Sequence, residues 1–194
     1  MTKQGVTSRG SAMNLKTISY LKRRTAVLAI GQSTLRNQGA PGVAAAARQF
    51  LASMDLRHFA VDSEKSFLRV LDRETKKLMQ ALPVGTKNWG AARKALNIFL
   101  RDCVYDRFLC EHFGLAQVHP WLELPLDSYA AVGLGKTLLG SSLPKWDAIK
   151  RLKEEDSAAY QQVAREVASR LGCHPVDLDI YLWRQLGIED IEGI

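Results

Sequence analysis

Apolar residues recur at helical spacing along most of this chain, and this pattern restricts the fold more than any other feature of the sequence. Phe67, Leu71, Leu78 and Leu82 fall on one face of a helix and leave Arg, Lys and Glu on the other. No stretch alternates apolar and polar residues for long enough to indicate a sheet strand. The sequence therefore predicts an all-α fold.

Prolines, glycines and capping residues divide this pattern into separate helices. The expected helices are 14–35, one opened by Pro41 through "VAAAARQFLASM", one capped by Asp62, 91–113 ending at Gly114, 128–139, and 156–171 followed by "PVDLDIYLWRQLG". Segment 91–113 is apolar on all sides, which predicts a central helix. Residues 1–13 are polar and irregular, so we expect disorder or an extension there, and one helical domain over 14–194.

The charge balance favours a polyanionic partner. The chain has 27 Lys and Arg against 20 Asp and Glu, a formal net charge of +7. Nucleic acid is the first candidate, because cations that contact phosphates release counterions. A basic surface that serves only solubility is the alternative. The cations are spread along the chain, so a binding face would have to be assembled by folding.

Several function classes lack the motifs that they require. No apolar run approaches the roughly 20 residues of a membrane span, and the N-terminus lacks a secretory signal, which predicts a cytoplasmic protein without a membrane partner. Cys103, Cys110 and Cys173 form no CxxC pair, and the four histidines lack HExxH spacing. "GLGKT" at 133–137 resembles the end of a P-loop, but Ala130 stands where its first glycine belongs. We therefore expect no metal and no cofactor.

Asp127 and Lys94 are the two residues with the strongest case for chemistry. Asp127 lies in "WLELPLDSYAAVGL", directly before a segment of helix formers, where Asp is a favoured N-cap. Its simplest interpretation is a cap, and the simplest interpretation of Lys94 is a solvated cation. A third interpretation takes both residues together with their surroundings.

Three segments in order, "LPVGTKNWGAARKALNIFL", "HPWLELPLDS" and "HPVDLDIYLW", resemble the helix-hairpin-helix DNA glycosylase superfamily. The chain is most similar to the archaeal 8-oxoguanine DNA glycosylase branch, over roughly residues 30–187. "PLDS" is the most specific element, and the interval of 33 residues between Lys94 and Asp127 fits this branch best. The resemblance implies a bundle of about eight to ten helices in two lobes with a cleft between them.

The resemblance also implies roles for individual residues. Asp127 and Lys94 would be catalytic, although a shift of one position would put Arg93 in the place of Lys94. Gln38, with Gln32 as its rival, would bind the extruded base together with Asp179 and Trp183, for which core packing is the alternative. The residues expected to contact DNA in and after the hairpin are Gly85, Lys87, Asn88, Trp89, Gly90 and Arg93.

The function that the resemblance implies is a DNA glycosylase. Such an enzyme flips a modified base out of duplex DNA and cleaves its N-glycosidic bond, with strand cleavage as well if Lys94 forms a Schiff base. Expected substrates are glucosylated hydroxymethylcytosine of phage DNA, for phage defence, and 8-oxoguanine, for DNA repair. The expected partner is double-stranded DNA with a modified base, bound by a monomer. A non-catalytic helix-hairpin-helix DNA-binding module and a helical protein-interaction domain are the alternatives.

Overall fold

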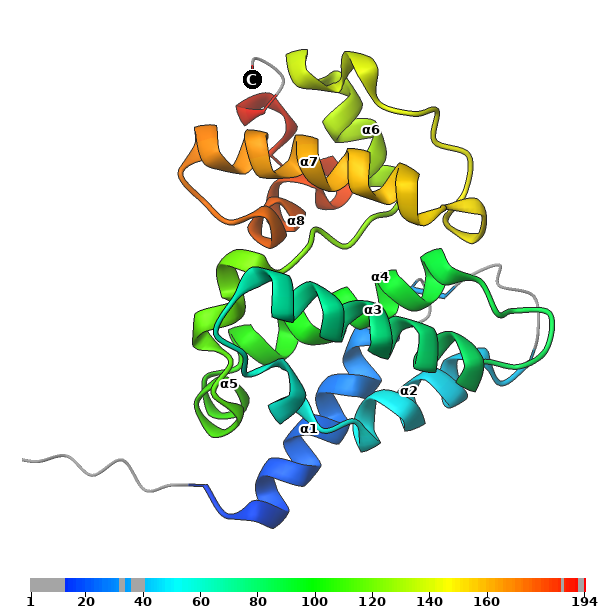
Figure 1. The fold of residues 1–194 in the computed structure, drawn as a ribbon, viewed down its shortest axis with the longest axis vertical. Coiled ribbons are helices and arrows are strands. Elements are labelled where there is room, and N and C mark those ends of the chain that lie inside the picture. Colours follow the sequence, from blue (N-terminus) through cyan, green and yellow to red (C-terminus); the bar gives the residue numbers. More distant parts are fainter. Residues whose placement is uncertain (1–12, 32–33, 36–40, 186, 192–193) are drawn as a thin grey trace, which may run out of the picture.

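Helices make up all the regular secondary structure of the described residues, and the all-α prediction is confirmed (Figure 1). The structure is a computed structural model that describes residues 13–31, 34–35, 41–185, 187–191 and 194. The α-helices are α1 (Leu15–Ala29), α2 (Val43–Ser53), α3 (Glu64–Ala81), α4 (Trp89–Tyr105), α5 (Arg107–Phe113), α6 (Ser128–Lys136), α7 (Glu154–Leu171) and α8 (Leu178–Leu182). The 3-10 helices are η1 (Leu56–Phe59), η2 (Ala116–Trp121), η3 (Leu138–Ser142), η4 (Ile149–Arg151), η5 (Pro175–Asp177), η6 (Trp183–Gln185) and η7 (Ile188–Asp190).

Two separate clusters of buried apolar side chains hold these helices together. The first lies among α1 to α5 and includes Phe67 and Phe99. The second lies among α6, α7 and α8 and includes Leu134 and Val167. Figure 1 shows the two groups of helices one above the other, and residues 122–127 run between them without helical structure.

α4 is the central helix, as its apolar pattern predicts. It packs against α1, α2 and α3 of the first group and against η4 of the second. Gly90, at its N-terminus, allows a close approach to η4, because a Cβ built there would lie only 2.1 Å from the carbonyl oxygen of Ile149. α4 therefore fixes the position of one group of helices against the other.

The expected helix over 91–113 is two helices, and the prediction of one is wrong. Asp106 has extended backbone angles (φ −80°, ψ 112°), and its carboxylate accepts from the backbone N–H groups of Phe108 and Leu109, both at 3.0 Å. Asp favours such a capping geometry over a helix interior, which explains the break. Gly114 ends α5 in the left-handed conformation (φ 68°), as predicted.

Other helix ends differ by a few residues from the sequence-based expectation. α2 begins after Gly42 (φ 85°) rather than at Pro41. Ser63 caps α3 in place of Asp62, because its hydroxyl accepts from the N–H of Ser66. α1 is shorter than 14–35, and α6 ends at Lys136, after which the chain continues as η3. The prediction for residues 1–13 concerns residues that, apart from Met13, lie outside the described part of the chain.

Two observations bear on membranes and metals. Among the described residues, no helix is long and apolar enough to cross a membrane. Within the same part of the chain, no group of three or more His, Cys, Asp and Glu side chains could hold a metal ion.

Candidate active site

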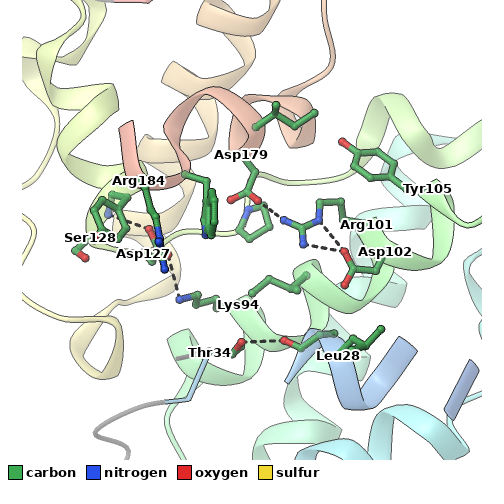
Figure 2. A pocket seen from close by; sticks show the side chains of 16 residues that line it. Leu28, Thr34, Lys94, Arg101, Asp102, Tyr105, Asp127, Ser128, Asp179 and Arg184 are labelled. Carbon is green, nitrogen blue, oxygen red and sulfur yellow. Dashed lines mark hydrogen bonds and ion pairs between the residues drawn. The ribbon is translucent and has the colours of Figure 1, made fainter. Parts of the chain in front are cut away.

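A pocket with a volume of about 840 Å³ lies where α1 and α4 face α6 and α8 (Figure 2). Its lining carries three cations, Lys94, Arg101 and Arg184, and three carboxylates, Asp102, Asp127 and Asp179. These residues are far apart in the sequence, and only the fold brings them together. The pocket is therefore a strongly polar site of a size suited to a small organic group.

One face of α4 forms a wall of this pocket. Lys94, Ile98, Arg101 and Tyr105 all line it, and their spacing of four, three and four residues puts them in one row along the helix. Lys94 is the one residue of this row that the sequence-based prediction includes. The same helical spacing would have identified Arg101 and Tyr105 as its companions.

Asp127 is the N-cap of α6, and its two carboxylate oxygens have different partners. Oδ1 accepts from the backbone N–H groups of Tyr129 at 2.9 Å and Ala130 at 3.1 Å. Oδ2 lies 3.2 Å from Nζ of Lys94. The predicted cap is confirmed, and the capping geometry holds the second oxygen toward the pocket and Lys94.

Arg93 and Lys94 lie on different sides of α4, and this difference decides which of the two cations lines the pocket. The Arg93 side chain is 7% exposed and turns into the interior. Its guanidinium binds Glu123 through two hydrogen bonds, at 2.8 and 2.9 Å, and Asp72 through a third at 2.8 Å. Lys94 is the residue that lines the pocket. The expectation that Arg93 contacts DNA does not fit its position, because the side chain is buried and paired.

Asp179 lines the pocket as expected, but its carboxylate is held by a cation. Arg101 forms ion pairs with both Asp179 and Asp102. Burial raises the pKa of Asp179 above its ordinary value, and the nearby charge of Arg101 opposes that shift. Figure 2 shows Arg101 between the carboxylates of Asp179 and Asp102. Any contact of Asp179 with a ligand would compete with Arg101.

Trp183 and Arg184 complete the C-terminal wall. Trp183 directly follows α8, lines the pocket and is 51% exposed, so the alternative of core packing is excluded. The Arg184 guanidinium lies over its indole ring, with the guanidinium carbon 4.7 Å from the ring centroid. Arg184 has positive backbone angles (φ 52°, ψ 21°), which L-residues rarely adopt. No sequence pattern indicated this residue.

The first three hairpin residues lie in the exposed connection between α3 and α4, outside the pocket lining. Gly85 has a left-handed conformation (φ 85°) and is exposed. Lys87 is exposed as well, and its Nζ lies 3.4 Å from Oε1 of Gln80. Asn88 caps α4 by accepting from the N–H of Ala91 at 2.9 Å. Gly85 and Lys87 remain the accessible members of the expected DNA contact.

Trp89 is half-buried and Gly90 is buried. Trp89 packs against the second apolar cluster, and its Nε1 is buried without a hydrogen-bond partner among the described residues. Gly90 is buried against η4. Both residues pack between the two groups of helices, and this position does not fit the expected contact with DNA. Gln38 and its rival Gln32 lie outside the described residues.

Comparison with known proteins found no match to this chain among protein-family models, curated proteins or solved structures.

Proposed function

We propose that this protein is a DNA glycosylase that acts as a monomer on double-stranded DNA containing a modified base. The observation that carries the proposal is the Lys94–Asp127 ion pair on the wall of a roomy pocket, in a chain with a net charge of +7. In this proposal the two groups of helices are the two lobes of a helix-hairpin-helix glycosylase, and the pocket is part of the cleft between them.

Asp127 would stabilise the transition state. Breaking an N-glycosidic bond develops positive charge on the sugar, and a fixed carboxylate beside it lowers the barrier electrostatically. Oδ1 is engaged by the N-terminus of α6, so Oδ2 is the oxygen directed at the pocket. This division explains how one residue can cap a helix and serve catalysis.

Lys94 allows two courses for the reaction. In the first, deprotonated Nζ attacks C1′, and the electron pair of the bond from C1′ to the base nitrogen leaves with the base. The C1′–O4′ bond of the resulting aminal then breaks, O4′ takes its electron pair and a proton, and the Schiff base that forms at C1′ leads to strand cleavage. Asp127 is within reach to accept the ammonium proton. In the second, water attacks C1′ and the product is an abasic site. Lys94 then supports binding alone.

Two substrates remain the leading candidates. Glucosylated hydroxymethylcytosine of phage DNA comes first, with a role in phage defence, and 8-oxoguanine follows, with a role in repair. The volume of about 840 Å³ gives room for either extruded base, including one that carries a sugar. The half-exposed ring of Trp183 offers a surface for stacking.

The test is base release from a panel of duplexes. The panel contains 8-oxoguanine, uracil, alkylated purines, hydroxymethylcytosine and its glucosylated form. We expect the wild type to release one of these bases and Asp127→Asn to release none, because Asn retains a capping oxygen and loses the charge. An active Asp127→Asn variant at neutral pH would contradict the proposed mechanism.

A second experiment distinguishes the two courses. Borohydride reduces a Schiff base to a stable protein–DNA adduct, which we expect for the wild type and not for Lys94→Ala. Base release that persists in Lys94→Ala identifies a monofunctional glycosylase. Salt-sensitive DNA binding without release from any duplex would instead favour a non-catalytic DNA-binding module.

A further inference from the structure

Arg184 differs from the other cations of the pocket in having no carboxylate partner. Lys94 is paired with Asp127, and Arg101 is paired with both other carboxylates of the lining. Among the described residues, no Asp or Glu lies within ion-pair distance of Arg184, whose guanidinium lies over the Trp183 ring. The pocket therefore contains one cation whose charge is not balanced by its own lining.

The backbone holds Arg184 in an unfavourable conformation. It is the only residue other than glycine with positive φ in the part of the chain that the structure describes. An L-residue in this region brings its Cβ close to the backbone, so such positions persist where the surroundings enforce them and concentrate at functional sites. Here the turn follows the end of α8 and carries the side chain to the pocket. Figure 2 shows it extending toward the wall that carries Asp127 and Ser128.

The Trp183 ring lies beside the guanidinium, whose carbon is 4.7 Å from the ring centroid. A planar guanidinium stacked on an aromatic face keeps its N–H groups directed outward in its own plane, where they match two oxygens of one phosphate. Arg184 is exposed, so it lies at the rim of the pocket rather than at its base. At the rim, an extruded nucleotide presents its sugar–phosphate backbone, while its base lies deeper.

We propose that Arg184 binds a phosphate of the DNA strand beside the extruded nucleotide. This inference rests on the proposed function, which places the sugar of that nucleotide against Asp127. The flanking phosphates are attached to the same sugar and arrive at the rim with it. A phosphodiester is also the anionic group that every such nucleotide carries, so the contact is independent of the base.

The first experiment measures affinity for a duplex with a tetrahydrofuran abasic-site analogue by fluorescence anisotropy. We expect Arg184→Ala to bind about tenfold more weakly, as for one lost charge-assisted contact. The slope of log affinity against log salt should fall by about one. Arg184→Lys should fall between wild type and Ala, because charge remains and the planar stack is lost. Arg165→Ala, an exposed arginine on α7, is the control and should bind as wild type does.

The second experiment identifies the phosphate. Single methylphosphonates replace, in turn, the phosphates on either side of the analogue and so remove one charge each. We expect the wild type to lose affinity at one of these positions and Arg184→Ala to lose none there. An undiminished loss in Arg184→Ala at both positions would overturn the inference.

Arg184→Gly separates the side chain from the backbone. Glycine adopts positive φ without strain, so this variant should unfold at the same temperature as the wild type or higher, yet bind as weakly as Arg184→Ala. Wild-type affinity in Arg184→Gly would show that only the turn matters and would sink the proposal. If the wild type releases a base and Arg184→Ala binds equally well, the inference alone fails. If the wild type neither binds DNA nor releases a base, the proposed function fails with it.

Discussion

At the scale of single residues, Arg93 and Lys94 are sequence neighbours with opposite environments. The Arg93 guanidinium joins α4 to Glu123, beyond η2, and to Asp72 on α3. Asn97, one turn further along α4, donates to the same Glu123 carboxylate at 3.0 Å. This network fixes the rotation of α4 about its axis, and Lys94 faces the pocket as a consequence.

Loss of Arg93 should therefore destabilise the protein. Arg93→Ala leaves the Glu123 carboxylate, whose side chain is 10% exposed, without its main cation. We expect a decrease of about 3 kcal/mol in the free energy of unfolding, measured with urea. Arg69→Ala, an exposed position on α3, should change it by no more than about 0.5 kcal/mol. Unchanged stability in Arg93→Ala would show that the network has no structural role.

The cap made by Asp127 has its own measurable effect. Asp127→Ala removes the oxygen that accepts from two backbone N–H groups of α6, whereas Asp127→Asn keeps one side-chain oxygen that can accept from them. We expect Ala to be less stable than Asn by about 1 kcal/mol. Urea unfolding of the two variants side by side measures this difference. Equal stabilities would mean that the cap contributes nothing and that both oxygens are available to the pocket.

At the scale of secondary-structure elements, the position of α4 depends on the space at its N-terminus. A methyl group at Gly90 would lie 2.1 Å from the Ile149 carbonyl oxygen and 2.9 Å from Cβ of Leu152. Backbone atoms cannot yield as a flexible side chain does. The contact between α4 and η4 therefore requires glycine.

Gly90→Ala should separate these two elements. We expect it to lower the free energy of unfolding by at least about 2 kcal/mol, despite the higher helix propensity of alanine. Gly135→Ala is the matched control within α6, where an added Cβ meets no atom within 4 Å. That variant should be stabilised by about 0.5 kcal/mol. Denaturant unfolding of both variants checks the pair, and a Gly90→Ala protein as stable as wild type would contradict the close approach.

The sequence predicts most helices and misses particular ends, for a physical reason. Periodic apolar faces, as in α3 and α7, depend on many residues at once and are readable from the chain. A helix end depends on one or two hydrogen bonds made by a single capping residue. Asp106 interrupts a run of apolar residues because its carboxylate caps α5, and nothing in the surrounding pattern distinguishes it from a solvated Asp in a continuous helix.

At the scale of the whole molecule, a polar cluster connects the two groups of helices at the C-terminal end of α4, the end away from Gly90. The Tyr105 hydroxyl and the His119 ring both bind Oδ1 of Asp177, and the His174 N–H donates to its Oδ2 at 3.0 Å. Burial alone would raise the pKa of Asp177, but these hydrogen bonds bring it below the ordinary value. Residues of α4 and η2 thus stabilise a carboxylate at the end of η5, directly before α8.

The acid stability of the protein should depend on this carboxylate. Because the pKa of Asp177 is lower in the folded state, its contribution is present above the unfolded value of about 4 and is lost as pH falls through the folded value. We expect Asp177→Asn to be less stable at pH 7 and to lose less stability between pH 5 and pH 3. Asp62→Asn, at an exposed position, should follow the wild type. Urea unfolding at several pH values measures this, and parallel curves for Asp177→Asn and wild type would contradict it.

Only some of the residues that line the pocket can be predicted from the sequence. A resemblance predicts Asp127 and Lys94 together, and the fold brings Oδ2 of Asp127 and Nζ of Lys94 within 3.2 Å across 33 residues of sequence. Arg101 and Tyr105 were available from helical spacing. Arg184 was not, because a single residue of positive φ leaves no periodic signal, and the ion pair of Asp179 with Arg101 depends on the packing of α8 against α4.

The cap at Asp127 determines when the carboxylate becomes oriented. The two N–H groups at the start of α6 fix its torsion angle as soon as that helix forms. Under the proposed mechanism, positive charge that develops on the sugar would meet a carboxylate already aligned toward it, and little reorganisation energy would be needed at the moment of reaction. The alignment belongs to the folding reaction and takes place once in the lifetime of the molecule, whereas a carboxylate on a free loop would have to be oriented anew in every turnover.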